Sequence, residues 1–179
     1  MRNLVNLSLI IGVIVLFTAC SGSQEKQQEK ISLLEKELAK DAKPDAGKAG
    51  KLIDLYSAYV KAYPQDTICP EYLFRAANYS AGINNAKGGI DFLKQIDSLY
   101  PQSKRAGEAA FMQGFFYENY LNDLQNAGES YKQFIVKFPD HYMADDAAQM
   151  LKYLGNPEQM LKDFDSINKL AADTIAAKK

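Results

Sequence analysis

The segment SYKQFIVKFPDH, residues 130–141, decides the fold of this 179-residue chain. Two other segments end in the same way, LYSAYVKAYPQD at 55–66 and FLKQIDSLYPQS at 92–103. In each, an aromatic residue stands directly before a proline, and Pro64, Pro101 and Pro139 are spaced by 37 and 38 residues. A recurrence of this length is typical of proteins built from stacked repeats.

Ahead of each proline, apolar side chains recur at steps of three and four residues, which places them on one face of a helix. The three sets are Tyr56, Tyr59 and Tyr63, then Leu93, Ile96 and Tyr100, then Tyr131, Phe134 and Phe138. Proline ends each helix because it lacks an amide proton and disfavours helical geometry in the residue before it. The repeated unit is therefore a helix, an aromatic–proline stop, a short turn and another helix.

The whole chain is predicted to be all-α. Turn residues in NNAKGG (84–89), LND (121–123) and LGNPEQ (154–159) separate the other helices, and no segment alternates as a strand would. We expect eight helices, at about 26–41, 48–63, 70–84, 87–100, 104–121, 124–138, 142–154 and 157–177.

These helix pairs resemble tetratricopeptide repeats over about residues 48–154. The matching features are the aromatic–proline end of the second helix, as in YKQFIVKFP, and a first helix rich in small residues, as in ADDAAQMLKYLG. The resemblance implies a right-handed α-solenoid, in which each hairpin buries its apolar side only by stacking on its neighbours. The repeat domain is expected to cover residues 48–177.

The first residues have the layout of an export signal, with a positive end, an apolar stretch too short to span a membrane, and small residues before Cys20. FTAC at 17–20 resembles the lipobox of bacterial lipoproteins. That resemblance implies that residues 1–19 are a removed signal peptide and that Cys20 carries lipid. Residues 20–28 are then expected to form a lipidated tether, and 29–47 a capping helix with its linker.

The same resemblance suggests a location. Ser21 and Gly22 follow Cys20, where an aspartate would resemble the inner-membrane retention signal. We therefore expect attachment to an outer membrane, on its periplasmic face, or to the outer face of the plasma membrane in a cell with a single membrane.

The helix at 26–41 has two interpretations. Ile31, Leu34 and Leu38 have heptad-like spacing, so the helix could form a coiled coil that makes a homo-oligomer. Alternatively, it folds back on the helix at 48–63 and caps the stack. Such a short apolar stripe is marginal without tertiary packing, which favours the cap.

Little in the sequence points to catalysis, a metal or another cofactor. The formal net charge of −1, without a basic stretch, argues against a nucleic-acid partner. The only histidine, His141, has acids nearby, but a zinc site needs several nitrogen or sulfur ligands. Cys69 is interpreted as a small buried hydrophobe. We expect a protein that is not an enzyme.

The aromatic segment FMQGFFYENYL, residues 111–121, is apolar on several sides. Such a helix is either packed between neighbours or lines a groove. Packing is the favoured interpretation. In the groove interpretation, Tyr79, Tyr117 and Tyr120 would contact a bound peptide, since tyrosine brings an apolar ring and a hydroxyl to interfaces.

The layout of lipid, spacer and repeats resembles the outer-membrane β-barrel assembly lipoprotein (BamD type) and the periplasmic coordinator of the Tol–Pal system. The resemblance implies a membrane-anchored scaffold that binds other proteins of the cell envelope, in outer-membrane protein assembly or envelope maintenance. A solute-binding protein or an enzyme of the envelope is the alternative.

Overall fold

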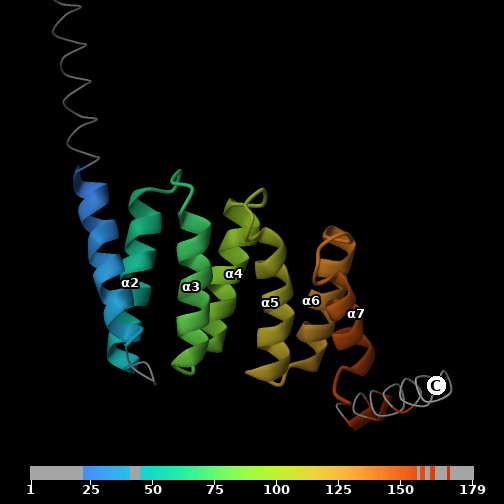
Figure 1. The fold of residues 1–179 in the computed structure, drawn as a ribbon. Helices are drawn as coiled ribbons and strands as arrows, with labels where there is room; N and C mark the ends of the chain where they lie inside the picture. Colours follow the sequence, from blue (N-terminus) through green and yellow to red (C-terminus); the bar gives the residue numbers. More distant parts are fainter. Residues whose placement is uncertain (1–21, 41–44, 157, 160–161, 164–168, 170–179) are drawn as a thin grey trace, which may run out of the picture. The chain divides into compact units, whose positions relative to one another are not determined.

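The computed structural model describes residues 22–40, 45–156, 158–159, 162–163 and 169, and these are helical apart from the turns between helices (Figure 1). A helix over 22–38 is followed by α2 (Ala46–Ala62), α3 (Cys69–Gly82), α4 (Ala86–Leu99), α5 (Ala106–Asn119), α6 (Leu124–Lys137) and α7 (Ala144–Tyr153). Successive helices pack on each other, as α2 does on α3 and α5 on α6. The predicted fold class, an all-α solenoid of helix–turn–helix repeats, is confirmed.

The helices α2 to α7 begin and end within about two residues of the predicted positions. The first helix differs, because residues 22–28, expected to belong to a tether, are helical. Gln24 and Gln28 donate to the Tyr59 hydroxyl on α2, and Gln24 also donates to Asp66 in the turn after α2, so this segment packs against the folded unit. The expected helix at 157–177 falls mostly outside the described residues.

One turn geometry recurs at each aromatic–proline stop. The N–H of the aromatic residue closes the helix by donating to the C=O four residues earlier, at 2.8–2.9 Å. The N–H three residues further on donates to the aromatic residue's C=O at 3.0–3.1 Å, from Asp66 to Tyr63, from Ser103 to Tyr100 and from His141 to Phe138. A third such bond then starts the next helix, from Cys69 to Asp66, from Ala106 to Ser103 and from Ala144 to His141. The three stops are therefore the same structure repeated.

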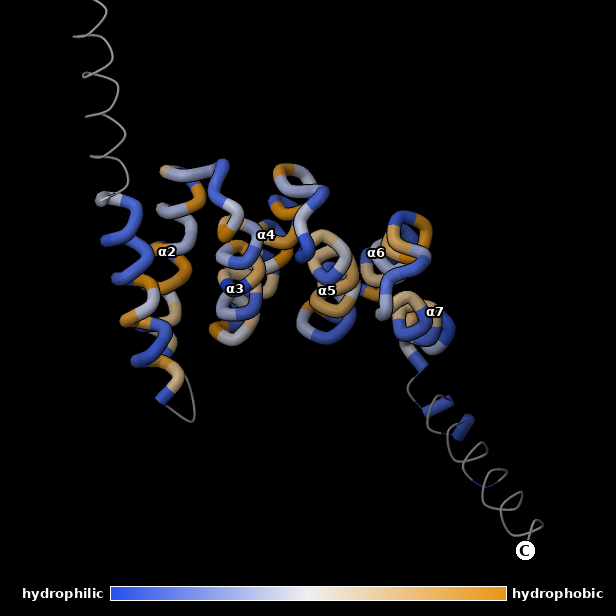
Figure 2. Tube along the Cα trace, turned by 45° about the horizontal axis from the view of Figure 1, so that its top comes forward, coloured by the Kyte–Doolittle hydropathy of each residue, from blue (hydrophilic) through white to orange (hydrophobic). Residues whose placement is uncertain are grey.

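The chain divides into two compact units, residues 1–92 and 93–179. The core of the first unit is rich in tyrosine, with the rings of Tyr56 and Tyr59 each 5.0 Å from that of Tyr72. Figure 2 shows both hydrophilic and hydrophobic residues along these helices, as expected for amphipathic helices. The rings on the predicted α2 face, Tyr56 and Tyr59, are fully buried.

The first unit also includes the helix over 22–38, which lies beside α2 (Figure 1). Ile31 and Leu38, two of the three residues of its predicted stripe, are buried within the same chain. An ion pair of 2.6 Å joins Glu37 to Lys48 at the start of α2. The apolar stripe that could have formed a coiled coil is thus used inside the monomer.

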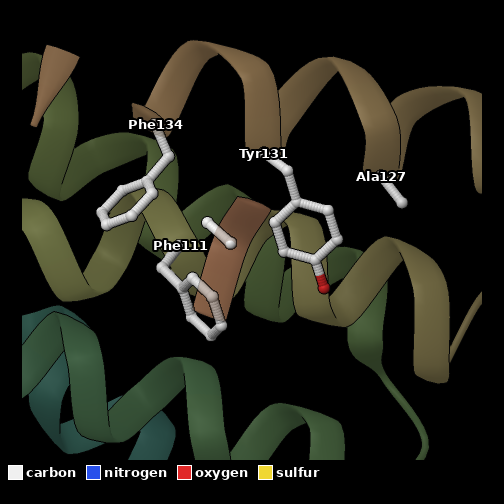
Figure 3. Packing of buried hydrophobic residues seen from close by; sticks show 5 residues of the cluster. Phe111, Ala127, Tyr131 and Phe134 are labelled. Atoms are coloured by element: carbon white, nitrogen blue, oxygen red, sulfur yellow. The ribbon is translucent and has the colours of Figure 1, made fainter. Parts of the chain in front are cut away.

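In the second unit, α5, α6 and α7 share a core. Phe111 from α5 contacts Tyr131 and Phe134 from α6, with ring centroids 5.7 and 5.6 Å apart (Figure 3). Gly114 lets α6 approach α5 closely, because a Cβ at that position would lie 2.6 Å from the ring of Tyr131. Phe111 and Phe116 are buried, so the favoured interpretation of segment 111–121 as core holds for these two rings.

Candidate functional site

A cleft of about 590 Å³ opens in the first unit, between the helix over 22–38, α2 and α3. This volume is in the range of pockets that hold ligands or peptide side chains. Its lining residues are Glu35, Ala39, Ala49, Tyr56, Arg75, Asn78, Tyr79, Gly82 and Ile83. More of the cleft wall comes from α3 than from the other two helices.

The spacing of α3 explains its contribution. Arg75, Asn78, Tyr79 and Gly82 follow one another at steps of three, one and three residues, so they lie on one face of the helix. Gly82, the last residue of α3, contributes no side chain, and a Cβ placed there would meet nothing within 4 Å. The space beside Gly82 is therefore free, and a larger side chain at this position would have room at this end of the cleft.

Charge in the cleft is organised around Arg75. Its guanidinium donates to Glu35 across the helix pair at 2.6 Å and to Glu71 one turn earlier at 2.7 Å. Burial acts to lower the pKa of Arg75, but the hydrogen bonds to the two carboxylates outweigh burial and raise that pKa. Arg75 thus bridges two carboxylates, and of these three charged groups only Arg75 and Glu35 line the cleft.

Tyr56 joins the charged group to the aromatic core. Its hydroxyl donates to Glu35 at 2.5 Å, while its ring stacks on that of Tyr72 and lies 6.5 Å from that of Tyr79. Burial, followed by the bond to Glu35, raises the pKa of Tyr56, so the phenol stays protonated at physiological pH. The cleft combines an aromatic wall with a fixed ionic group.

The three tyrosines proposed for a peptide groove are not found together in one unit. Tyr79 lines the cleft of the first unit. Tyr117 and Tyr120 belong to the second unit, where the Tyr117 hydroxyl accepts a bond of 3.1 Å from Lys94. Tyr120 is 52% exposed, with its ring edge-on to Phe116 at 5.1 Å. Whether any of them contacts a ligand stays a prediction.

His141 has a structural environment. Its ring lies edge-on to Phe134 at 5.4 Å and stacks on Tyr142 at 4.5 Å, and its Nδ1 accepts a bond from the N–H of Met143. A Cβ at Gly107 would lie 2.6 Å from the ring, so the histidine packs directly on the first turn of α5. In the part of the chain that the structure describes, no three His, Cys, Asp or Glu residues are placed to hold a metal ion.

Of the two cysteines, Cys69 lies in the part of the chain that the structure describes. Cys69 is fully buried, and its thiol donates to the C=O of Tyr63 at 3.1 Å. Cys20 and the signal expected at 1–19 lie outside the described residues. Among the residues that are described, no helix has the length and apolar character needed to cross a bilayer.

Comparison with protein families gives a match within the second unit. Residues 108–141 match the tetratricopeptide repeat family, and this stretch covers most of α5, all of α6 and the stop at Phe138-Pro139. The α5–α6 hairpin is therefore similar to a tetratricopeptide repeat. The same hydrogen-bonded stop also follows α2 and α4, and with the helical repeat architecture it supports a protein of the tetratricopeptide-repeat type. Searches of curated proteins and of solved structures found no significant match.

The cleft contains residues that sequence reasoning missed, chiefly Glu35, Arg75 and Asn78. Arg75 and Asn78 could have been found, because they share the helical spacing of Tyr79 on α3. Glu35 could not be found, since its partner Arg75 is 40 residues away and nothing local to either residue signals the pair.

Tetratricopeptide repeats are typically surfaces for binding other proteins rather than catalytic centres.

Proposed function

We propose that this protein is a lipid-anchored scaffold of the cell envelope that binds other envelope proteins through its repeat surfaces, in outer-membrane protein assembly or envelope maintenance. The observation that carries the proposal is the tetratricopeptide repeat at 108–141, together with the open cleft on α3. The N-terminal lipobox supports the anchor, and the order of lipobox and repeats supports the envelope role.

The chemistry of the cleft suits a polypeptide segment. Asn78 is exposed and offers both a hydrogen-bond donor and an acceptor, as a peptide main chain requires. Tyr79 offers a half-buried ring for an apolar side chain. The ion pair of Arg75 and Glu35 gives the site a fixed pattern of charge, which can make binding specific for one partner.

Crosslinking tests this function directly. A photo-reactive amino acid is placed at Asn78, in the cleft, and in a matched variant at Asp54, an exposed residue of α2 that does not line it. After irradiation of intact cells, we expect a discrete envelope protein attached at position 78 and not at 54, identified by mass spectrometry. Equal labelling at both positions, or none at 78, would contradict a binding role for the cleft.

The anchor needs its own test. Wild-type protein is expected to incorporate labelled fatty acid and to sediment with membranes, and processing is expected to stop when lipoprotein signal peptidase is inhibited. The Cys20→Ala variant should lose both the label and the membrane attachment. Continued attachment of that variant would argue against Cys20 as the anchor.

A further inference from the structure

The start of the first helix lies very near the proposed lipid attachment. The described helix begins at residue 22, and Ser21 alone separates Gly22 from Cys20. Two residue steps can span at most about 7 Å even when fully extended. A lipid on Cys20 would therefore hold the folded unit against the bilayer surface instead of at the end of a long tether.

This end of the helix is bound firmly to the rest of the first unit. Gln24 donates to the Tyr59 hydroxyl at 3.0 Å and to Asp66 at 2.5 Å, and Gln28 donates to the same hydroxyl at 2.6 Å. Ser23 accepts a bond of 3.2 Å from the Tyr63 hydroxyl. The helix start, the end of α2 and the turn after it thus form one rigid end of the unit.

That end has the surface expected for contact with lipid headgroups. Segments 22–30 and 61–68 together carry three acids and three bases, Glu25, Glu29 and Asp66 against Lys26, Lys30 and Lys61. Within these two segments, no large apolar side chain is exposed. The surface is polar with no net charge, so it suits the headgroup layer without insertion, and the lipid chains supply the binding free energy.

The cleft lies towards the other end of the same unit. Glu35 follows Gln24 by eleven residues, which is about 16 Å along a helix axis. Ala49, near the start of α2, and Gly82, at the end of α3, come from the matching ends, while Tyr56 and Arg75 lie in the middle of their helices. Distance from the anchor is therefore set by helix length and not by a flexible chain.

We propose that the first unit stands on the lipid headgroups by the end formed of residues 22–30 and 61–68, and so holds its cleft at a fixed height above the bilayer. This inference rests on the proposed lipid anchor at Cys20. A partner reaching the cleft would bind at that height, roughly 16 Å beyond the contact surface by the helix rise.

The experiment uses the full lipidated chain in vesicles of phosphatidylethanolamine, with or without phosphatidylglycerol, that carry a quencher on the headgroups. A fluorophore is attached through Lys26→Cys or, as the matched variant, Lys36→Cys, both exposed on the same helix. The native Cys69 is fully buried and does not compete for the label. We expect the fluorophore at position 26 to be quenched and the fluorophore at position 36 to remain unquenched. Adding phosphatidylglycerol should not change this difference.

A linker variant sharpens the test. A flexible glycine–serine insert of about eight residues between Ser21 and Gly22 averages about 16 Å end to end. It should abolish the difference between positions 26 and 36 while vesicle binding persists. Equal quenching at both positions without the insert would overturn the fixed height but leave the anchor intact. Failure of the unaltered protein to bind vesicles would overturn the anchor itself, and this inference with it.

Discussion

The hydroxyl of Tyr131 on α6 donates a hydrogen bond of 2.8 Å to the carboxylate of Glu118 on α5. The first unit contains the same arrangement, since Tyr56 of α2 donates to Glu35 of the preceding helix at 2.5 Å. In both cases a fully buried ring keeps its polar tip satisfied by an acid near the end of the partner helix. The helix over 22–38 therefore bonds to α2 through a tyrosine and a glutamate, as α5 does to α6.

Removing the Tyr131 hydroxyl should measure what this bond contributes. Tyr131→Phe is expected to lower the free energy of unfolding by about 1 kcal/mol, the net value of a typical hydrogen bond. Urea denaturation followed by circular dichroism gives the value. The control is Tyr142→Phe, because the Tyr142 hydroxyl also bonds to a glutamate, Glu108, but the side chain is 73% exposed. If Tyr142→Phe loses as much free energy of unfolding as Tyr131→Phe, burial of the tyrosine does not determine what its hydrogen bond contributes.

Gly114 should not tolerate even one added methyl group. Gly114→Ala brings a Cβ to 2.6 Å from the buried ring of Tyr131, and such overpacking costs about 1–3 kcal/mol. Thermal unfolding is expected to show a lower midpoint. Gly50→Ala in α2 is the matched control, since its Cβ would meet nothing within 4 Å. That variant should gain about 0.5–1 kcal/mol from helix propensity alone.

A second variant separates overpacking from other causes. Replacing Tyr131 by leucine in the Gly114→Ala background removes the ring that the new methyl group meets. Part of the lost stability should return, so that the double variant is more stable than the sum of the single changes predicts. Strict additivity would show that contact with Tyr131 is not the reason for the glycine.

Asp66 should make stability depend on pH on the acid side. Burial acts to raise the pKa of Asp66, but bonds donated by the Tyr59 hydroxyl, the N–H of Ile68 and Gln24 outweigh burial and lower that pKa. The carboxylate therefore stabilises the fold above its unfolded-state pKa of about 3.9, and this contribution is lost as pH falls through the lower folded-state value. Asp66→Asn should flatten the decline in urea midpoint between neutral and acidic pH.

The control for that experiment is Asp54→Asn, a change at an exposed position of α2. It is expected to leave the acid decline as steep as in the unaltered protein. If the urea midpoint of Asp66→Asn falls as steeply with pH as that of the unaltered protein, the hydrogen bonds of Asp66 do not contribute to the pH dependence of stability. Burial, followed by the bond to Asp66, raises the pKa of Tyr59 to about 12, so the phenol takes no part in this transition.

Filling the cleft should block binding without harming the fold. In Gly82→Leu, the first added atom meets nothing within 4 Å, so the side chain has room to occupy the open end of the cleft. Stability should be unchanged or slightly raised, while crosslinking from position 78 is lost. Gly50→Leu, at a second open glycine outside the cleft, should leave crosslinking as it is. Persistence of the crosslink in Gly82→Leu would exclude this cleft as the contact surface.

Much of the fold followed from periodicity and proline alone. The rings predicted for one face of α6, Tyr131 and Phe134, are buried, and the third, Phe138, is partly buried beside the stop. These features are local, because helical spacing and the missing amide of proline act within a few residues. The same reasoning placed the ends of α2 to α7 to within about two residues.

The cleft could not be foreseen in the same way. It depends on Glu35 meeting Arg75 across 40 residues of sequence, and on Gly82 leaving space at the end of α3. The early start of the first helix, at residue 22 instead of about 26, was missed for a related reason. Its glutamines look like solvated tether residues, and only their bonds to Tyr59 and Asp66 make them part of the folded unit.

The three matching stops have a consequence for how this chain could change in length. Each joins a helix to its successor through the same ladder of backbone bonds, after Tyr63, Tyr100 and Phe138. Cutting at one stop and rejoining at another would remove or duplicate a complete hairpin while leaving the junction chemically unaltered. Duplication or deletion within the gene can therefore add or remove a whole hairpin. The length of the resulting chain would change in steps of 37 or 38 residues.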